Sequence, residues 1–137
     1  MPTKGARSLT PISKKRLSGN RKLGSLGERL AGESLVRRGY VIVECGWRTA
    51  RGEIDIVARD GDCWVFVEVK TRRGRSAGLP EEALTPRKAA RLVELAQTYL
   101  AEHALGDVDW RLDLVAVELD VKGGVKRLDI LPCVVTD

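Results

Sequence analysis

Two β-prone segments of this chain carry charged residues at positions where a buried strand would normally carry apolar side chains. The first is Gly52-Glu53-Ile54-Asp55-Ile56-Val57, and the second contains Glu68-Val69-Lys70. Burying a charge is costly unless a partner or a metal ion compensates it. Because Mg²⁺ and similar cations bind carboxylate oxygens, these segments indicate a divalent-cation site and, with it, phosphodiester chemistry.

Strand geometry places these charges together. Side chains alternate between the two faces of a strand, so Glu53 and Asp55 share one face, as do Glu68 and Lys70. The intervening Asp60-Gly61-Asp62 predicts a hairpin. A two-residue turn at Asp60-Gly61 would make Asp55 the diagonal neighbour of Glu68, whereas a four-residue loop would place the two acids directly opposite each other. Both registers bring the acids and the lysine to the same face.

Three side chains of this face have roles in the expected chemistry. Asp55 and Glu68 would supply oxygen ligands for Mg²⁺ or Mn²⁺, with the Val69 carbonyl beside them on the strand. Lys70 would stabilise the charge that develops on the phosphate or orient the attacking water. The alternative interpretation is an ordinary ion pair between Lys70 and one of the acids on a solvated strand face.

Signals for helix ends and turns predict the elements that position these residues. Residues 25–38 form a helix that ends at Gly39, a residue suited to helix C-termini. Thr85-Pro86 begins a second helix, with Thr85 as its N-cap. A further hairpin turn is expected at Gly123-Gly124. Strands are expected at 41–45, 53–59, 63–71, 111–119 and 125–131. The order α-β-β-β-α-β-β predicts an α/β protein with a mixed central β-sheet flanked by helices.

The length and composition fit a single domain at residues 24–137, preceded by a basic tail. The chain has 137 residues, of which 43% are hydrophobic, and a net charge of +5. Residues 1–23 contain seven basic residues and no acid, together with proline, glycine and serine, so this tail is expected to be disordered. It would attract phosphates without regard to sequence, or serve only to keep the protein soluble.

Composition also argues against several classes of protein. No run of 18 apolar residues could span a membrane, and the basic N-terminal segment lacks the apolar stretch of a signal peptide, so we expect a cytoplasmic protein without a membrane partner. The three cysteines are widely separated and lack CxxC spacing, which argues against a zinc site and for reduced thiols. His103 is the only histidine, which disfavours a nucleophilic triad.

A longer ordered pattern runs through both charged segments. It consists of Gly24-x3-Glu28-x2-Ala31-x3-Leu35-x3-Gly39-Tyr40, the two segments themselves, Glu82-Ala83, Lys88 and Arg111-x-Asp113-x-Val115. In this combination, residues 24–120 resemble the YraN-like family of small, uncharacterised bacterial proteins. That family is similar to archaeal Holliday-junction resolvases and to restriction endonucleases with a PD-(D/E)xK nuclease core. The resemblance implies a restriction-endonuclease-like core and, since the related resolvases act as dimers, a homodimer.

The resemblance also implies a role for each residue of the site. Asp55, Glu68 and Lys70 occupy the D, E and K positions of the nuclease motif and would be the catalytic residues. Glu28 would join Asp55 and Glu68 as a metal ligand contributed by the first helix. The local sequence Ser25-x-x-Glu28 is also typical of a capping box, which would give Glu28 a purely local role.

Basic residues near these acids indicate a nucleic-acid partner, because a basic rim can hold the backbone while a metal holds the scissile phosphate. Trp47, in a basic segment between two strands, is a candidate to stack on an unpaired base. Arg87 and Arg91, which open the second helix with Lys88, could belong to this rim, but they fit an ordinary solvated helix face better. The residues expected to contact nucleic acid, DNA rather than RNA, are Arg48, Arg51, Arg72, Arg73, Arg75 and Lys88.

The expected function is Mg²⁺-dependent hydrolysis of DNA phosphodiester bonds, with branched or structured DNA as the substrate. Two alternatives stay open at this point. One is a nucleic-acid-binding protein that retains the nuclease fold without cutting, whose binding would fall steeply with salt. The other is a protein-interaction or assembly factor, in which the basic tail and the Gly123-Gly124 hairpin contact partners.

Overall fold

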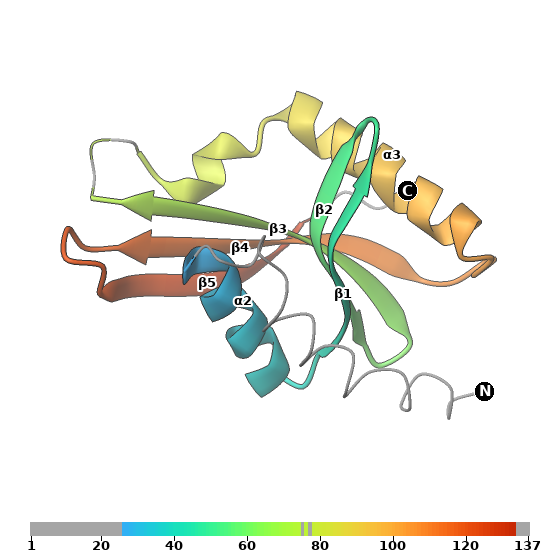
Figure 1. Ribbon diagram of the computed structural model, residues 1–137, viewed down its shortest axis with the longest axis horizontal. Helices are drawn as coiled ribbons and strands as arrows, with labels where there is room; N and C mark the ends of the chain where they lie inside the picture. The colour runs from blue at the N-terminus through green and yellow to red at the C-terminus, as the bar shows by residue number, and fades with distance from the viewer. Residues whose placement is uncertain (1–25, 75, 77, 134–137) are drawn as a thin grey trace.

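The computed structural model describes residues 26–74, 76 and 78–133 (Figure 1). The predicted basic tail, the Ser25 of the capping box and Arg75 lie outside the described residues. The elements are α2 (Leu26–Arg37), β1 (Val41–Thr49), β2 (Gly52–Asp60), β3 (Cys63–Arg73), the 3₁₀-helix η2 (Pro80–Ala83), α3 (Pro86–Glu102), β4 (Trp110–Leu119) and β5 (Val125–Cys133). This order confirms the predicted α/β architecture.

The five strands form one mixed sheet in the order β1-β2-β3-β4-β5. β3 and β4 are parallel, whereas all other neighbouring strands are antiparallel. Parallel neighbours need a long crossover connection, and η2 together with α3 provides it. β3, which carries Glu68 and Lys70, therefore lies in the middle of the sheet, with two strands on each side.

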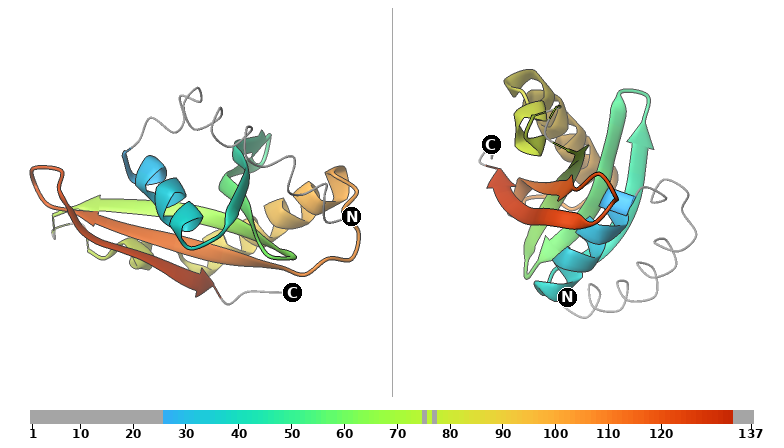
Figure 2. Two further views of the ribbon diagram at one scale, coloured as in Figure 1. Left: turned by 90° about the horizontal axis from the view of Figure 1, so that it is seen from below. Right: turned by 90° about the vertical axis from the view of Figure 1, so that its left-hand side faces the viewer.

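The two long helices cover opposite faces of the sheet (Figure 2). Ala31 and Leu35 of α2 pack with buried residues of β1 to β5 on one face. Leu92, Ala96 and Tyr99 of α3 pack on the other face, against a second buried cluster from β1 to β4. Within the described part of the chain, no helix is long and apolar enough to cross a membrane.

α2 lies unusually close to β3. A Cβ atom placed on Gly27 would overlap the hydroxyl of Thr71, so only glycine allows this approach. The helix ends as predicted at Gly39, which has a φ of +93°. The Gly39 N–H donates to the Val36 carbonyl, and the Tyr40 N–H donates to the Leu35 carbonyl at 3.0 Å, so glycine closes the helix and turns the chain into β1.

The β2–β3 hairpin turns one residue later than the two-residue turn considered at Asp60-Gly61. Asp60 pairs with Cys63, so the loop is Gly61-Asp62. Gly61 has a φ of +63°, a conformation that glycine adopts without steric cost, and it takes the first loop position. The register is therefore that of the predicted four-residue alternative, and continuing it past Ile56↔Val67 brings Asp55 across from Glu68.

β1 is longer than predicted and includes Trp47. The indole is only 9% exposed, and its ring meets the Tyr99 ring edge-on at 5.1 Å between centroids. The prediction that Trp47 stacks on an unpaired base is therefore wrong, because α3 covers this tryptophan. The β1–β2 hairpin twists away from the rest of the sheet and stands beside α3 (Figure 1).

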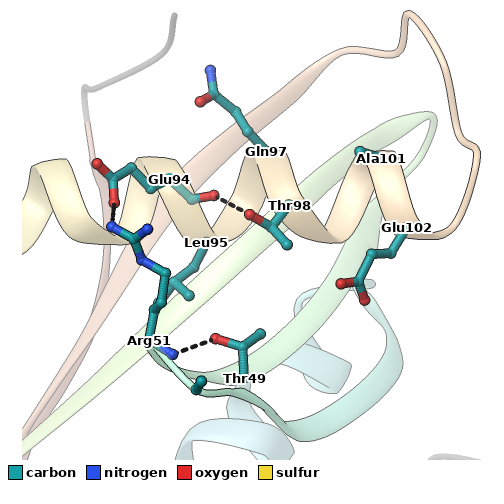
Figure 3. Close-up of a pocket in the computed structure, with 9 residues that line it drawn as sticks. Thr49, Arg51, Glu94, Leu95, Gln97, Thr98, Ala101 and Glu102 are labelled. Carbon is teal, nitrogen blue, oxygen red and sulfur yellow. Dashed lines mark hydrogen bonds and ion pairs between the residues drawn. The ribbon is translucent and has the colours of Figure 1, made fainter.

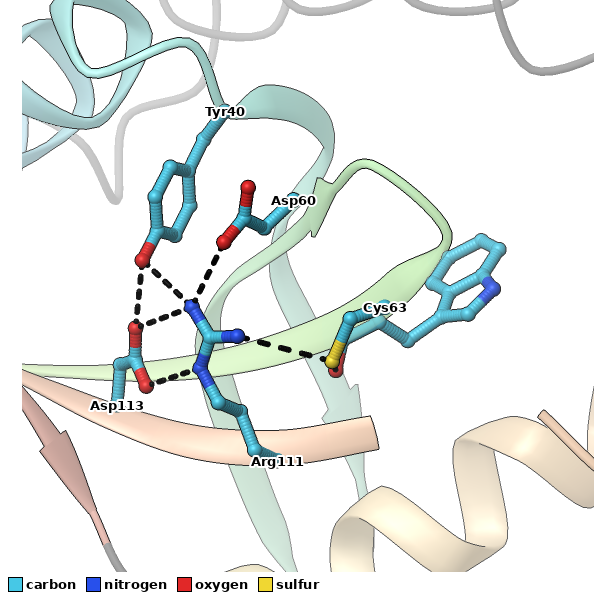
Figure 4. Close-up of polar contacts among 6 residues, drawn as sticks. Tyr40, Asp60, Cys63, Arg111 and Asp113 are labelled. Atoms are coloured by element: carbon cyan, nitrogen blue, oxygen red, sulfur yellow. Dashed lines mark hydrogen bonds and ion pairs between the residues drawn. The ribbon is translucent and has the colours of Figure 1, made fainter. Parts of the chain in front are cut away.

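A buried ionic network ties the end of α2 to β4 (Figure 4). Asp113 is 1% exposed, and Arg111 donates to it from Nε at 2.9 Å. The Tyr40 hydroxyl donates to the same carboxylate at 3.1 Å, and burial beside Asp113 raises the pKa of this tyrosine. Arg111 also reaches Asp60 at 3.2 Å. These contacts give Arg111 and Asp113 of the family pattern a structural role.

A second network fixes the segment that leads into α3. The guanidinium of Arg127 in β5 contacts three carboxylates, those of Glu81 at 2.9 Å, Glu118 at 2.6 Å and Asp129 at 2.8 Å. Glu118 is buried in β4, whereas Glu81 belongs to η2. The arginine therefore ties η2 to the sheet, immediately before α3 begins.

Candidate active site

The site begins where strands β2 and β3 stop pairing. Their regular pairing runs from the hairpin turn to Ile56↔Val67. Beyond that pair, the carboxylate of Asp55 takes the place of the neighbouring backbone and accepts a 2.8 Å hydrogen bond from the Val69 N–H. The N–H and C=O of one strand residue point to the same side, so the Val69 carbonyl is also directed towards β2.

Glu68 and Lys70 lie on either side of Val69 and share the sheet face covered by α3. Glu68 Oε2 and Lys70 Nζ are 3.5 Å apart, and the two side chains are only 18% and 27% exposed. The ion pair that the sequence left as an alternative is thus present. It holds the lysine beside Glu68 rather than in open solvent.

Burial and neighbouring acids disfavour the charged forms of both carboxyl groups. The pKa of Asp55 is raised from 3.8 to about 8, first by burial and then by the charge of Glu68, against the opposing hydrogen bond from Val69. Burial also raises the pKa of Glu68, although the charges of Lys70 and Lys88 act in the opposite direction. The two lysines thus do not offset burial at Glu68, and a divalent cation would favour the charged forms of both acids.

Glu28 lies at the edge of this site. It is half-buried in the first turn of α2, and its charge contributes to the raised pKa of Asp55. Among the described residues, no three acidic, cysteine or histidine side chains converge closely enough to form a metal-binding group. The structure thus brings Asp55 and Glu68 together and leaves Glu28 outside that pair. Two carboxylates still fit Mg²⁺, which commonly retains several waters.

Glu68 opens onto a cleft of about 380 Å³ between the sheet and the start of α3, whereas Asp55 lies behind it, at the Val69 N–H. Glu53, Glu68 and Lys70 line its sheet side. The facing side is formed by the beginning of α3, where the Thr85 side chain caps the helix by accepting from the Lys88 N–H at 3.3 Å. The residues that α3 contributes to the cleft are Arg87, Lys88, Arg91, Leu92 and Leu95.

The residues predicted to bind nucleic acid lie in three places. Arg48 and Arg51 sit at the β1–β2 turn, where Arg48 pairs with Glu53 at 3.1 Å and Arg51 pairs with Glu94 at 3.3 Å. Arg72 and Arg73 end β3, and the buried Nε of Arg72 has no hydrogen-bond partner among the described residues. Among the described members of this predicted set, which exclude Arg75, only Lys88 lines the cleft that contains Glu68.

The sequence favours a solvated helix face for Arg87 and Arg91 over a place in a basic rim around the acids. Both side chains are exposed, and both line the same hollow as Glu68 and Lys70. Their positions on either side of Lys88 place both arginines at the start of α3. The direction in which the start of α3 faces depends on how the helix packs on the sheet, and local sequence does not determine that packing.

A second hollow of about 610 Å³ continues along α3 beneath the β1–β2 turn (Figure 3). Leu95 lines both hollows. Arg51 and Glu94, which form an ion pair, both line this second hollow. Arg91, which lines the first hollow, donates from Nη1 to the Arg51 carbonyl at 3.2 Å. These contacts attach the hairpin turn to α3 between the two hollows.

Comparison with known proteins identifies similar chains in bacteria. Residues 27–117 match the model of the uncharacterised protein family UPF0102. A UPF0102 protein of Roseiflexus castenholzii is 46% identical over 118 residues, which are 85% of this chain and 94% of that relative. A UPF0102 protein of Beutenbergia cavernae is 48% identical over 109 residues, which are 80% of this chain and 92% of that relative.

Proposed function

The chain belongs to the uncharacterised protein family UPF0102, and from this premise and the geometry of its cleft we propose that it is a metal-dependent nuclease that hydrolyses DNA. Two half-buried carboxylates, one of them paired with a lysine, carry the proposal. Asp55 and Glu68 lie together on adjacent strands, Lys70 pairs with Glu68, and the facing side of the cleft is basic. Acidic and basic walls of this kind suit a phosphodiester held next to a cation.

Asp55 and Glu68 would hold Mg²⁺ or Mn²⁺ together with the Val69 carbonyl. Bound there, the metal would lower the pKa of a coordinated water and neutralise charge on the phosphate. Glu28 would act from the edge of the site through its negative charge or through a metal-bound water. Asp55 must lose its proton to act as a ligand, so its raised pKa makes this site sensitive to pH.

Lys70 has a separate role in this proposal. Its ammonium group lies 3.5 Å from Glu68, on the same face as the acids. When the carboxylates bind a cation, the lysine remains beside them and can stabilise the negative charge that builds on the phosphate oxygens. Removing such a preorganised donor typically costs about 10²- to 10³-fold in rate.

The proposed substrate is branched or structured DNA in the bacterial cytoplasm. Basic side chains lie at the β1–β2 turn, at the end of β3 and at the start of α3, so they can contact the backbone on several sides of the cleft. A surface of this kind fits DNA whose strands diverge better than it fits a single straight strand. A homodimer would present two such clefts to the two strands of a junction.

Cleavage of defined DNA substrates tests the catalytic proposal. The full chain is incubated with branched, nicked, duplex and single-stranded DNA, with Mg²⁺ or Mn²⁺ and with EDTA. We expect metal-dependent cleavage that Asp55→Ala abolishes and Lys70→Ala reduces by about 10²-fold or more. Asp62→Ala removes an exposed acid at the β2–β3 turn and should leave cleavage unchanged. Absence of any cleavage that depends on Asp55 would overturn the proposal.

A second candidate function is binding of nucleic acid without cleavage. Two observations favour it, namely the ion pair between Glu68 and Lys70 and the lack of a three-ligand metal group among the residues placed in the structure. In this case, DNA binding would survive Asp55→Ala and would not depend on a divalent cation. Filter binding with and without Mg²⁺ separates the two functions.

A further inference from the structure

The start of α3 carries a basic surface whose particular ligand the proposed function leaves unassigned. Arg87, Lys88 and Arg91, which we call the α3 basic ledge, line one side of the cleft. Glu68 and Lys70 line the sheet side of the same hollow. The two sides are close enough for the charge of Lys88 to lower the pKa of Glu68 against the effect of burial.

The charges of this ledge are available to a ligand. Neither Arg87 nor Lys88 forms an ion pair with any carboxylate that the structure places, whereas Arg48 and Arg51 are paired with Glu53 and Glu94. Arg91 uses Nη1 to donate to the Arg51 carbonyl, a neutral partner that leaves its charge uncompensated. Three positive charges therefore line the cleft without an ion pair, and only Lys88 is close enough to Glu68 to affect its pKa.

The size of the cleft limits what these charges can hold. A hollow of about 380 Å³ falls at the small end of the range for ligand sites and would admit a short piece of DNA backbone rather than a whole duplex. If the scissile phosphate lies at a metal held by Asp55 and Glu68, it meets this hollow at Glu68, and the facing side is left for the next phosphate along the strand. Arginine suits that position, because its planar guanidinium binds phosphate oxygens in pairs.

We propose that the α3 basic ledge binds the backbone phosphate adjacent to the scissile phosphate on the same DNA strand. The inference rests on the proposed nuclease function and assigns Arg87 and Arg91 to substrate binding together with Lys88. Contacts to a phosphate carry no sequence information, so the ledge fixes the position of the strand and not the choice of base.

The salt dependence of DNA binding tests this assignment. Affinities of the full chain for labelled single-stranded and duplex DNA are measured in EDTA, which prevents metal-dependent cleavage, over a series of salt concentrations. The double variant Arg87→Ala/Arg91→Ala should reduce the slope of log affinity against log salt by about 1, for every sequence alike. Arg87→Lys/Arg91→Lys keeps the charge and should retain most of the slope.

A charge-matched control lies on the other side of the sheet. Arg37→Ala/Arg38→Ala removes two exposed arginines at the end of α2, and its slope should equal that of the unmodified protein. Thermal unfolding of all variants verifies that they are folded. An unchanged slope in Arg87→Ala/Arg91→Ala would overturn the assignment, and so would a loss confined to duplex DNA, which would place the contact on the opposite strand.

The two proposals fail in different ways. If the unmodified protein binds DNA with the expected slope but does not cleave it with metal, the nuclease function fails and the phosphate contact remains. If cleavage depends on Asp55 but the salt-dependence slope is the same with and without Arg87 and Arg91, the phosphate contact assigned to the α3 basic ledge is wrong and the nuclease function stands. If the unmodified protein binds no DNA at low salt, both proposals are overturned.

Discussion

The Asp55 carboxylate accepts a 2.8 Å hydrogen bond from the Val69 N–H at the point where β2 and β3 cease to pair. The Asp55 side chain thereby substitutes for a backbone acceptor of β2, so the Val69 N–H of β3 is hydrogen-bonded although the two strands no longer pair there. The same contact positions the acid between Glu28 of α2 and Glu68 of β3, whose charges both raise its pKa. Asp55 thus completes the hydrogen bonding of a central strand, and it does so in a place where burial and neighbouring acids disfavour its charged form.

Stability should fall as the pH rises in the absence of metal. Folding raises the pKa of Asp55 from 3.8 to about 8, so the folded state holds this proton more tightly than the unfolded state does. The resulting stabilisation is complete at low pH and is lost as the pH rises towards about 8. Urea unfolding in EDTA, from about pH 5 to about pH 8, should therefore give a decreasing free energy of unfolding.

The variant Asp55→Asn assigns this pH dependence to one group. The amide has no titrating proton, and its oxygen can still accept from Val69, so the free energy of unfolding should vary less with pH. Asp62→Asn, at the exposed hairpin turn, should behave like the unmodified protein. Equal pH dependence in Asp55→Asn and the unmodified protein would show that Asp55 titrates normally.

Metal binding should release protons near neutral pH. Asp55 is largely protonated there, and a metal ligand must be deprotonated, so each bound Mn²⁺ or Mg²⁺ should displace up to one proton. Calorimetric titration in two buffers of different ionisation enthalpy measures this number, and affinity should increase from about pH 6 to about pH 8.5. Binding without proton release, or binding that persists in Asp55→Asn, would place the metal elsewhere.

Gly27→Ala should destabilise the fold. The added methyl group would overlap the Thr71 hydroxyl, and overpacking of this kind typically costs about 1–3 kcal/mol. Thr71→Ala removes the clashing oxygen, so the double variant should recover part of the loss in a urea unfolding cycle. Additive losses would show that α2 does not rest on β3 at this point. Gly39→Ala at the helix end is no substitute control, because its positive φ adds backbone strain.

Arg111→Ala should be among the most destabilising single changes. It leaves Asp113, which is 1% exposed, without its cationic partner, and removing one member of a buried ion pair commonly costs about 3–5 kcal/mol. Arg111→Leu/Asp113→Leu replaces both charges by apolar groups and should restore much of the stability. Thermal unfolding of the single and double variants measures the effect, and equal losses in both would contradict it.

Local signals predicted the elements well because each acts over a few residues. The Thr85 cap and the positive φ of Gly39 mark helix ends wherever the chain later packs. The observed hairpin turn lies one residue after the two-residue turn predicted at Asp60-Gly61. Local sequence does not separate the two positions, because Asp60-Gly61 and Gly61-Asp62 both contain the glycine that the turn requires. The two possible registers differ only in how β2 and β3 pair beyond the turn, and the turn residues do not determine that pairing.

Properties that depend on distant segments could not be predicted in the same way. Trp47 is buried because α3, about fifty residues later in the chain, packs over it through Tyr99. Arg87 and Arg91 line the cleft because of the rotation of that helix about its own axis. Sequence parity did place Asp55, Glu68 and Lys70 together, since alternation along paired strands is itself a local rule.

The described residues that line the cleft fall between Gly52 and Leu95, on β2, β3 and α3. The contact between Tyr40 and Arg111, which braces the domain, joins two positions outside that stretch. The cleft walls and this brace are thus encoded in separate parts of the gene. Substitutions in the cleft walls would leave the brace in place, so the surface of the cleft can vary among relatives while this part of the fold is kept.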